Sequence, residues 1–191
     1  MKRFLTVLLL VLALTACASN ESAPATDTTA EPEAVFDLDA YKSAVSECRT
    51  AINNAGLIIA NVGSYEVNFC KSMNNINENT GWGSYTIETE DVAESGFAWL
   101  EEKTDYTRET VDTSYSEIQQ QYKEIILTEI EGAEAKEIDA AFRELYDAYT
   151  TLYSLVTTPS GLPQDFAKEI LACANTMTDS DEALALFRDE S

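Results

Sequence analysis

The sequence LDAYKSAVSECRTAINNAGLIIANVGSYEVNFCKSMNNI, at residues 38–76, decides the fold of this chain. Its apolar side chains recur at alternating intervals of three and four residues, and one charged residue interrupts them. The series is Leu38, Tyr41, Val45, Cys48, Ile52, Ala55, Ile59, Val62, Glu66, Phe69, Met73 and Ile76. This spacing places the side chains on one face of an α-helix, about 58 Å long if unbroken. That face has to be covered, so we expect later helices to pack along it.

Later parts of the chain repeat this helical periodicity. We expect a second helix over 89–131 with a polar middle at 103–112, a third over 134–157, a fourth starting at Pro163, and a short fifth after a capping pattern at 179–182. Short connections make neighbouring helices antiparallel. The sequence therefore predicts an all-α fold, an antiparallel helical bundle of three to five helices built on a long helical hairpin. This domain occupies residues 36–191.

The first helix contains two glycines beside its apolar series. Gly56 and Gly63 indicate close approach of another helix; a break near Gly63 is the alternative, and we expect a continuous helix. Asp37 or Asp39 is expected to cap its N-terminus. Counting residues back from each turn predicts which positions on neighbouring helices lie at the same level. By this count, only two helices reach the far end of the hairpin, near Phe69.

The chain begins with a basic pair and an apolar run that is too short to span a bilayer. Lys2 and Arg3 precede apolar residues 4–14, and Leu-Thr-Ala-Cys occupies residues 14–17. This arrangement resembles the lipobox of bacterial lipoproteins. The resemblance implies that residues 1–16 are a signal peptide and that Cys17 becomes the acylated N-terminus, which anchors the protein in a membrane. An ordinary secretory signal with a chance cysteine, or a signal anchor, are the alternative interpretations.

The segment after the lipobox has the composition of a linker. Residues 17–35 are rich in Ser, Thr, Ala, Glu and Pro and carry few large apolar side chains. Such a segment cannot bury a core, so we expect a disordered tether between the lipid and the folded domain. The lipoprotein interpretation places the protein on the extracytoplasmic face of a membrane. Both the cell membrane of a Gram-positive host and a Gram-negative outer membrane agree with the sequence.

Charge and composition exclude several classes of function. The chain has 34 acidic and 12 basic side chains and no histidine, for a net charge of −22. Nucleic-acid binding is disfavoured because phosphate contacts require Lys and Arg. The lack of histidine removes Ser-His-Asp and Cys-His catalysis, His-containing zinc sites and His-ligated haem. With no phosphate-binding loop or nucleophile–base set apparent, we expect no catalytic residue, cofactor or metal.

The leading functional hypothesis is a non-enzymatic envelope lipoprotein whose helical bundle binds an unidentified protein partner. Trp82 lies between two glycines at the expected hairpin turn, so Trp82 and Tyr85 are candidate partner contacts. Alternatively, Trp82 folds back and packs with Trp99. The second hypothesis is a small-ligand or cation-binding lipoprotein. Its groove would be lined by tyrosines of the lower bundle, the part of the bundle nearer the tether. Those tyrosines are Tyr115, Tyr122, Tyr146, Tyr149 and Tyr153.

Two interactions inside the bundle follow from counting residues along the helices. Lys103 lies about one turn from the level of Glu66, so we predict an ion pair between them. Cys48 and Cys173 fall at the same level, which predicts a disulfide between them and leaves Cys70 free. The competing interpretation is three reduced, buried cysteines that act as small apolar residues.

Mass spectrometry of the mature protein tests the lipobox. We expect its N-terminus to be Cys17 carrying two or three acyl chains, and we expect Cys17→Ser to shift the protein from the membrane to the soluble fraction. An intact signal peptide, or an unmodified product cleaved at another position, would contradict this prediction.

Overall fold

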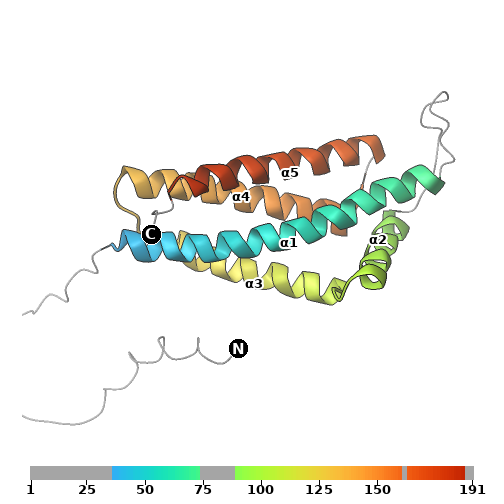
Figure 1. Cartoon of the computed structure of the whole chain (residues 1–191), viewed down its shortest axis with the longest axis horizontal. Helices are drawn as coiled ribbons and strands as arrows, with labels where there is room; N and C mark the ends of the chain where they lie inside the picture. Colours follow the sequence, from blue (N-terminus) through green and yellow to red (C-terminus); the bar gives the residue numbers. More distant parts are fainter. Residues whose placement is uncertain (1–35, 74–88, 161–162, 188–191) are drawn as a thin grey trace, which may run out of the picture. The chain divides into compact units, whose positions relative to one another are not determined.

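The computed structural model describes residues 36–73, 89–160 and 163–187, which belong to the unit Val35–Ser191. Throughout these residues every regular element is a helix, and no strand occurs among them (Figure 1). This confirms the predicted all-α bundle. The helices are α1 (Leu38–Met73), α2 (Thr89–Lys103), α3 (Arg108–Ile126), α4 (Ala133–Thr157) and α5 (Pro163–Ala185).

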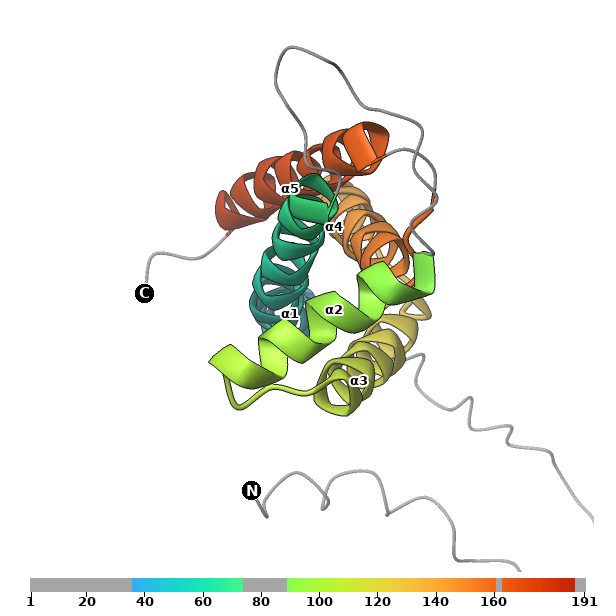
Figure 2. The same cartoon turned by 90° about the vertical axis from the view of Figure 1, so that its right-hand side faces the viewer.

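α1 is the helix on which the rest of the bundle packs. It contacts α2, α3, α4 and α5, and Figure 2 shows α2 crossing in front of it. The predicted apolar series forms its buried face, where Ile52 and Val62 are completely enclosed. α1 continues without a break past Gly63, as expected. The Asp37 carboxylate accepts a hydrogen bond of 3.0 Å from the Ala40 N–H, which caps the first turn.

Gly56 and Gly63 allow α4 and α5 to approach α1 closely, as the sequence indicates. A Cβ added to Gly56 would lie 2.4 Å from Met177 Cε. A Cβ added to Gly63 would lie 2.7 Å from Ile170 Cδ1 and 2.9 Å from Val156 Cγ2. These distances are shorter than van der Waals contact, so a larger side chain would force Met177, Ile170 and Val156 to shift. The two α5 contacts also fix α5 antiparallel to α1.

A buried ion pair joins α1 to α5. The Arg49 guanidinium donates to both carboxylate oxygens of Asp181, at 2.5 and 2.8 Å, and the Asn53 amide donates to the same carboxylate. Arg49 is 8% exposed, so this bidentate contact is largely removed from water. The sequence assigned residues 179–182 to the start of a separate fifth helix, and that assignment is wrong. α5 continues through them because Asp181 faces α1 instead of capping a new helix.

The predicted single helix over 89–131 is two helices, α2 and α3. Residues 104–107 redirect the chain between them, so α2 crosses α1 whereas α3 lies along it (Figures 1 and 2). α3 has its own capping box, in which the Thr107 hydroxyl accepts from the Thr110 N–H and the Thr107 N–H donates to the Thr110 hydroxyl. The polar stretch in the sequence is therefore a helix boundary.

The predicted Cys48–Cys173 disulfide is absent, and these two cysteines are not neighbours. Both are buried free thiols. Gly56 faces Met177, so Cys173, one turn earlier on α5, lies level with about residue 60 of α1. That level is about 12 residues, or about 18 Å of helix, from Cys48, far beyond the span of a disulfide. The count failed because it treated α2 and α3 as one straight helix antiparallel to α1, and because it set α4 and α5 about six residues out of register, since Val156 and Ile170 meet at Gly63.

The count also predicted too few helices around the far end of the hairpin. Val156 of α4 and Ile170 of α5 both pack at Gly63, so α4 and α5 cover α1 farther along than the count predicted. Tyr65 then lies about half a turn, and Phe69 less than two turns, beyond this level on α1.

Replacing Arg49 tests the contribution of the buried ion pair. We expect Arg49→Met to lower the free energy of unfolding by about 2 kcal/mol, because charge-assisted hydrogen bonds are lost in a mostly buried position. Urea unfolding followed by circular dichroism measures this change. Lys168→Met is the matched control, since the Lys168–Asp165 pair is exposed on both sides and should contribute at most about 0.5 kcal/mol. Equal effects of the two substitutions would contradict the prediction.

Candidate functional site

Several residues that the sequence singles out lie outside the described part of the chain. Cys17, Trp82 and Tyr85 are in this group, so their roles stay predictions. Across the described residues, no helix combines the length and the apolar character needed to cross a bilayer. The same residues contain no cluster of three or more Asp, Glu, Cys or His side chains suited to a metal ion.

The tyrosines of the lower bundle pack on one another between α3 and α4. The ring centroids of Tyr115 and Tyr153 are 3.8 Å apart and those of Tyr122 and Tyr146 are 3.5 Å apart, both nearly parallel. The Tyr153 hydroxyl donates to Asp112 at 2.7 Å. The rings themselves therefore fill the space that the ligand-groove hypothesis assigned to a bound molecule.

Tyr149 lies deeper than these four tyrosines and is completely enclosed. Its hydroxyl has no hydrogen-bond partner among the described residues, and burial raises its pKa. A shallow, open hollow of about 510 Å³ runs between α4 and α5 on another side of the bundle. It is lined by Ala140, Arg143, Glu144, Asp147, Ala148, Thr151, Ala172, Cys173 and Thr176.

The most unusual group in the structure is Glu66, which lies where α2 crosses α1. Glu66 is 0% exposed, and neither of its carboxyl oxygens has a hydrogen-bond partner among the described residues. Gly96 of α2 lies directly against it: a Cβ added to Gly96 would be 2.5 Å from Glu66 Oε1 and 2.7 Å from its Cγ. A larger residue at this position would therefore force the Glu66 side chain, Val62 or α2 itself to shift.

The predicted Glu66–Lys103 ion pair is wrong. Lys103 is half-exposed, and its Nζ lies 2.5 Å from Oε1 of Glu102, its neighbour in the chain. α2 ends at Lys103, and its side chain extends into solvent at that end instead of returning toward the buried face. The sequence identified Glu66 as an interruption of the apolar series but offered no signal for where α2 turns.

Burial controls the acidity of Glu66. Its removal from water raises the pKa of the carboxyl group to about 9, and Arg108 at the start of α3 acts in the opposite direction. The Arg108 guanidinium lies 5.0 Å from the centre of the Phe97 ring. Burial and the nearby Glu66 also raise the pKa of the Cys70 thiol. Glu66 is thus a neutral carboxylic acid at neutral pH while α2 covers it.

A second feature is an uncharged surface on an otherwise acidic chain. Residues 50–70 contain one charged side chain, the buried Glu66, and residues 170–178 contain none. Leu57 is 66% exposed and Leu171 is 61% exposed on the adjacent helices α1 and α5. We call this surface the neutral face. It comprises Asn54, Leu57, Asn61, Ser64 and Asn68 of α1 and Leu171, Ala174, Asn175 and Thr178 of α5.

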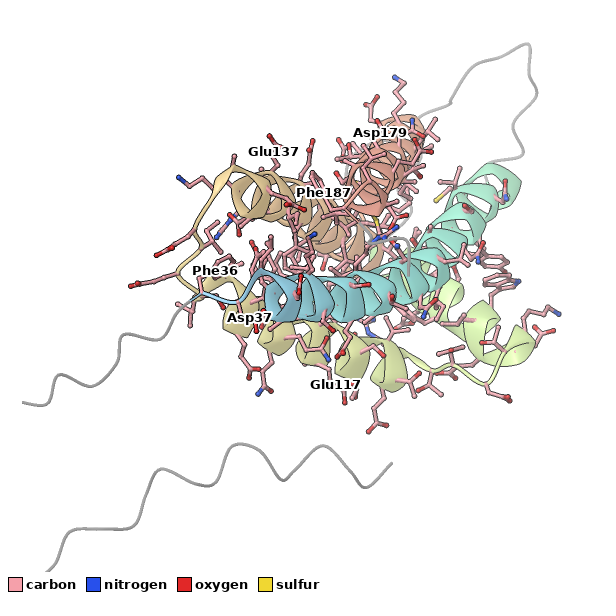
Figure 3. The ribbon with its side chains drawn as sticks, turned by 60° about the vertical axis from the view of Figure 1, so that its left-hand side comes forward. Phe36, Asp37, Glu117, Glu137, Asp179 and Phe187 are labelled. Atoms are coloured by element: carbon pink, nitrogen blue, oxygen red, sulfur yellow. The ribbon has the colours of Figure 1, made fainter. Side chains whose placement is uncertain are left out.

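The geometry of the α1–α5 contact makes the neutral face continuous. Gly56 touches Met177, and the next residue in each helix, Leu57 and Thr178, turns outward on the same side. Acidic side chains cover other parts of the bundle; Figure 3 shows Asp179, Glu117 and Glu137 projecting from α5, α3 and α4.

Sequence reasoning missed the neutral face because it followed the buried stripe of α1 and not the opposite one. The signal was available: the exposed positions from Thr50 to Asn68 also recur at intervals of three and four residues, and none is charged. Gly96 had no such signal, since its role depends on how α2 crosses α1.

Comparison with protein-family models, with curated proteins and with solved structures gives no match for this chain. The functional conclusions below therefore depend on its own residues and geometry.

Gly96→Ala tests the tight α1–α2 contact. We expect it to lower the free energy of unfolding by about 1–3 kcal/mol, because the new methyl group overlaps the Glu66 carboxyl group. Adding Glu66→Ala removes most of that overlap, so the double variant should be less destabilised than the sum of the single variants. Ala98→Ser, on the exposed side of the same helix, is the control. Strict additivity would contradict the contact.

Proposed function

We propose that this chain is a lipid-anchored protein of the bacterial envelope whose helical bundle binds another protein and catalyses no reaction. The observation that carries the proposal is the neutral face. A chain with a net charge of −22 leaves two adjacent helices uncharged over several turns, with two leucines exposed there. Charged groups are depleted at the centres of protein–protein contacts, as they are on this face.

The charges around the neutral face indicate the chemistry of the partner. Glu47 of α1 and Asp179 and Glu182 of α5 are exposed near one end of it, and Lys168 of α5 is exposed beside Leu171 toward the other end. A protein surface with an uncharged centre and basic groups opposite the acidic end complements this arrangement. An anionic lipid surface does not, because acidic side chains would be repelled from it.

An aromatic pair adjoins one end of the neutral face. Tyr65 follows Ser64 in α1 and stacks on Trp99 of α2, with ring centroids 5.0 Å apart. Both side chains are partly exposed. Tyrosine and tryptophan often contribute most of the binding energy in protein interfaces, so this pair supports a contact that extends toward α2.

The membrane attachment in this proposal comes from the start of the chain. The lipobox-like residues 14–17 provide the acylated cysteine, and the linker at 17–35 gives the bundle room to reach its partner. The alternative of a small-ligand or cation site lined by tyrosines has less support, because the rings of those tyrosines stack on each other.

Site-specific photo-crosslinking in the producing cell tests partner binding. A photoreactive amino acid replaces Leu57 in one strain and Leu171 in a second. In the control strain it replaces Glu137, an exposed residue of α4. We expect one discrete protein adduct from each leucine position and none from the control. We also expect Leu171→Glu to remove the adduct formed at position 57, because a further acidic charge disrupts the uncharged centre. Equal crosslinking at position 137, or no adduct at either leucine, would contradict the proposal.

A further inference from the structure

α2 is held in the bundle mainly by one interface. Its main contact is with α1, whereas α4 and α5 pack on each other as well as on α1. The buried side chains of α2 are Val92, Ala93, Phe97 and Leu100. Residues 104–107 separate it from α3, so α2 can move without bending another helix. Helices held by one interface open more readily than the rest of a fold.

The surface beneath α2 holds the buried Glu66. A carboxylate with no hydrogen bonds is strongly disfavoured in such a position, while the protonated acid is far less so. From α2, the uncharged Gly96 faces it closely, and the acidic side chains Glu94 and Glu101 are exposed on the outside of that helix.

Two other titratable or charged groups act on Glu66 among the described residues. Cys70 lies one turn along α1, and its buried thiol is neutral. Arg108 approaches from α3, but it is half-exposed and its guanidinium lies over the Phe97 ring. Its Nε lies 3.9 Å from Oδ2 of Asp112. Asp112 in turn accepts the hydroxyl of Tyr153 from α4. Arg108 therefore weakens the effect of burial on Glu66 without forming an ion pair with it.

We propose that Glu66 is a proton-controlled latch for α2. While its carboxyl group carries a proton, α2 stays packed on α1 with Gly96 against the acid. Loss of the proton leaves a bare charge under the helix, and α2 then separates from α1 so that water can reach the carboxylate. Separation uncovers Val62 of α1 and Phe97 and Leu100 of α2. This device is independent of the neutral face, which α1 and α5 form on a different side.

The direction of the pH dependence follows from the two states. In the closed state the pKa of Glu66 is about 9, and in the open state, exposed to water, it returns to its ordinary value of about 4.3. Between these values the closed state binds more protons than the open state. Closure is therefore most stable below about pH 4, and the opening constant of α2 rises about tenfold per pH unit until about pH 9.

Hydrogen exchange of the full-length chain between pH 5 and pH 9 tests the latch. After correction for intrinsic exchange rates, amides of α2 should report an opening constant that rises about tenfold per pH unit. Amides in the middle of α4 should show no such rise. Glu66→Gln keeps the shape of the side chain but cannot ionise, so its α2 amides should lose the pH dependence and be better protected at pH 8. Glu94→Gln, on the exposed side of α2, should keep the wild-type slope.

Three results would overturn the latch. The first is an α2 opening constant that does not change with pH in the wild-type chain, and the second is an unchanged pH dependence in Glu66→Gln. The third is an equal pH dependence for α4 amides, which would mean that Glu66 acts on unfolding of the whole bundle. Glu66→Leu is a second variant in case glutamine disturbs the fold, and circular dichroism checks the helical content of each variant. A flat α2 profile in Glu66→Leu supports the latch, and a wild-type slope refutes it.

Discussion

The close approach of α4 and α5 to α1 at Gly56 and Gly63 is the constraint on which the bundle depends. Both glycines leave space that Met177, Ile170 and Val156 occupy, and those contacts set the register of three helices at once. The ion pair between Arg49 and Asp181 follows from that register, because it lies about two turns farther along the same α1–α5 contact. The apolar series of α1 supplies the burial, and the glycines determine which residues meet.

The sequence predicted the type of fold well and its register poorly. Periodicity alone located α1 and α4, because an uninterrupted amphipathic pattern has one physical interpretation. It failed at residues 104–107, where a polar stretch that also fits the outer face of a helix is a capped boundary. Every level counted through that boundary was then displaced, including the one that paired Cys48 with Cys173. Such errors accumulate along a chain because each count begins where the previous one ended.

The sequence likewise predicted only part of the candidate sites. The sequence identified Glu66 because it interrupts an apolar series, but its surroundings depend on the direction of α2, which the pattern does not contain. The neutral face needed knowledge of which α1 residues are exposed and which helix lies beside them. Local sequence therefore indicates unusual residues, and packing decides what those residues can do.

The central position of α1 has a consequence for when the protein can fold. α1 is synthesised first, yet it is covered by α4 and α5, which come from the last part of the chain. Its apolar face cannot be buried in the native way until Ile170 and Met177 have been made. Contacts between such distant parts of a chain form late and slow the folding reaction. The native bundle is therefore completed only after most of the chain has been made, which would suit a protein that crosses a membrane before it folds.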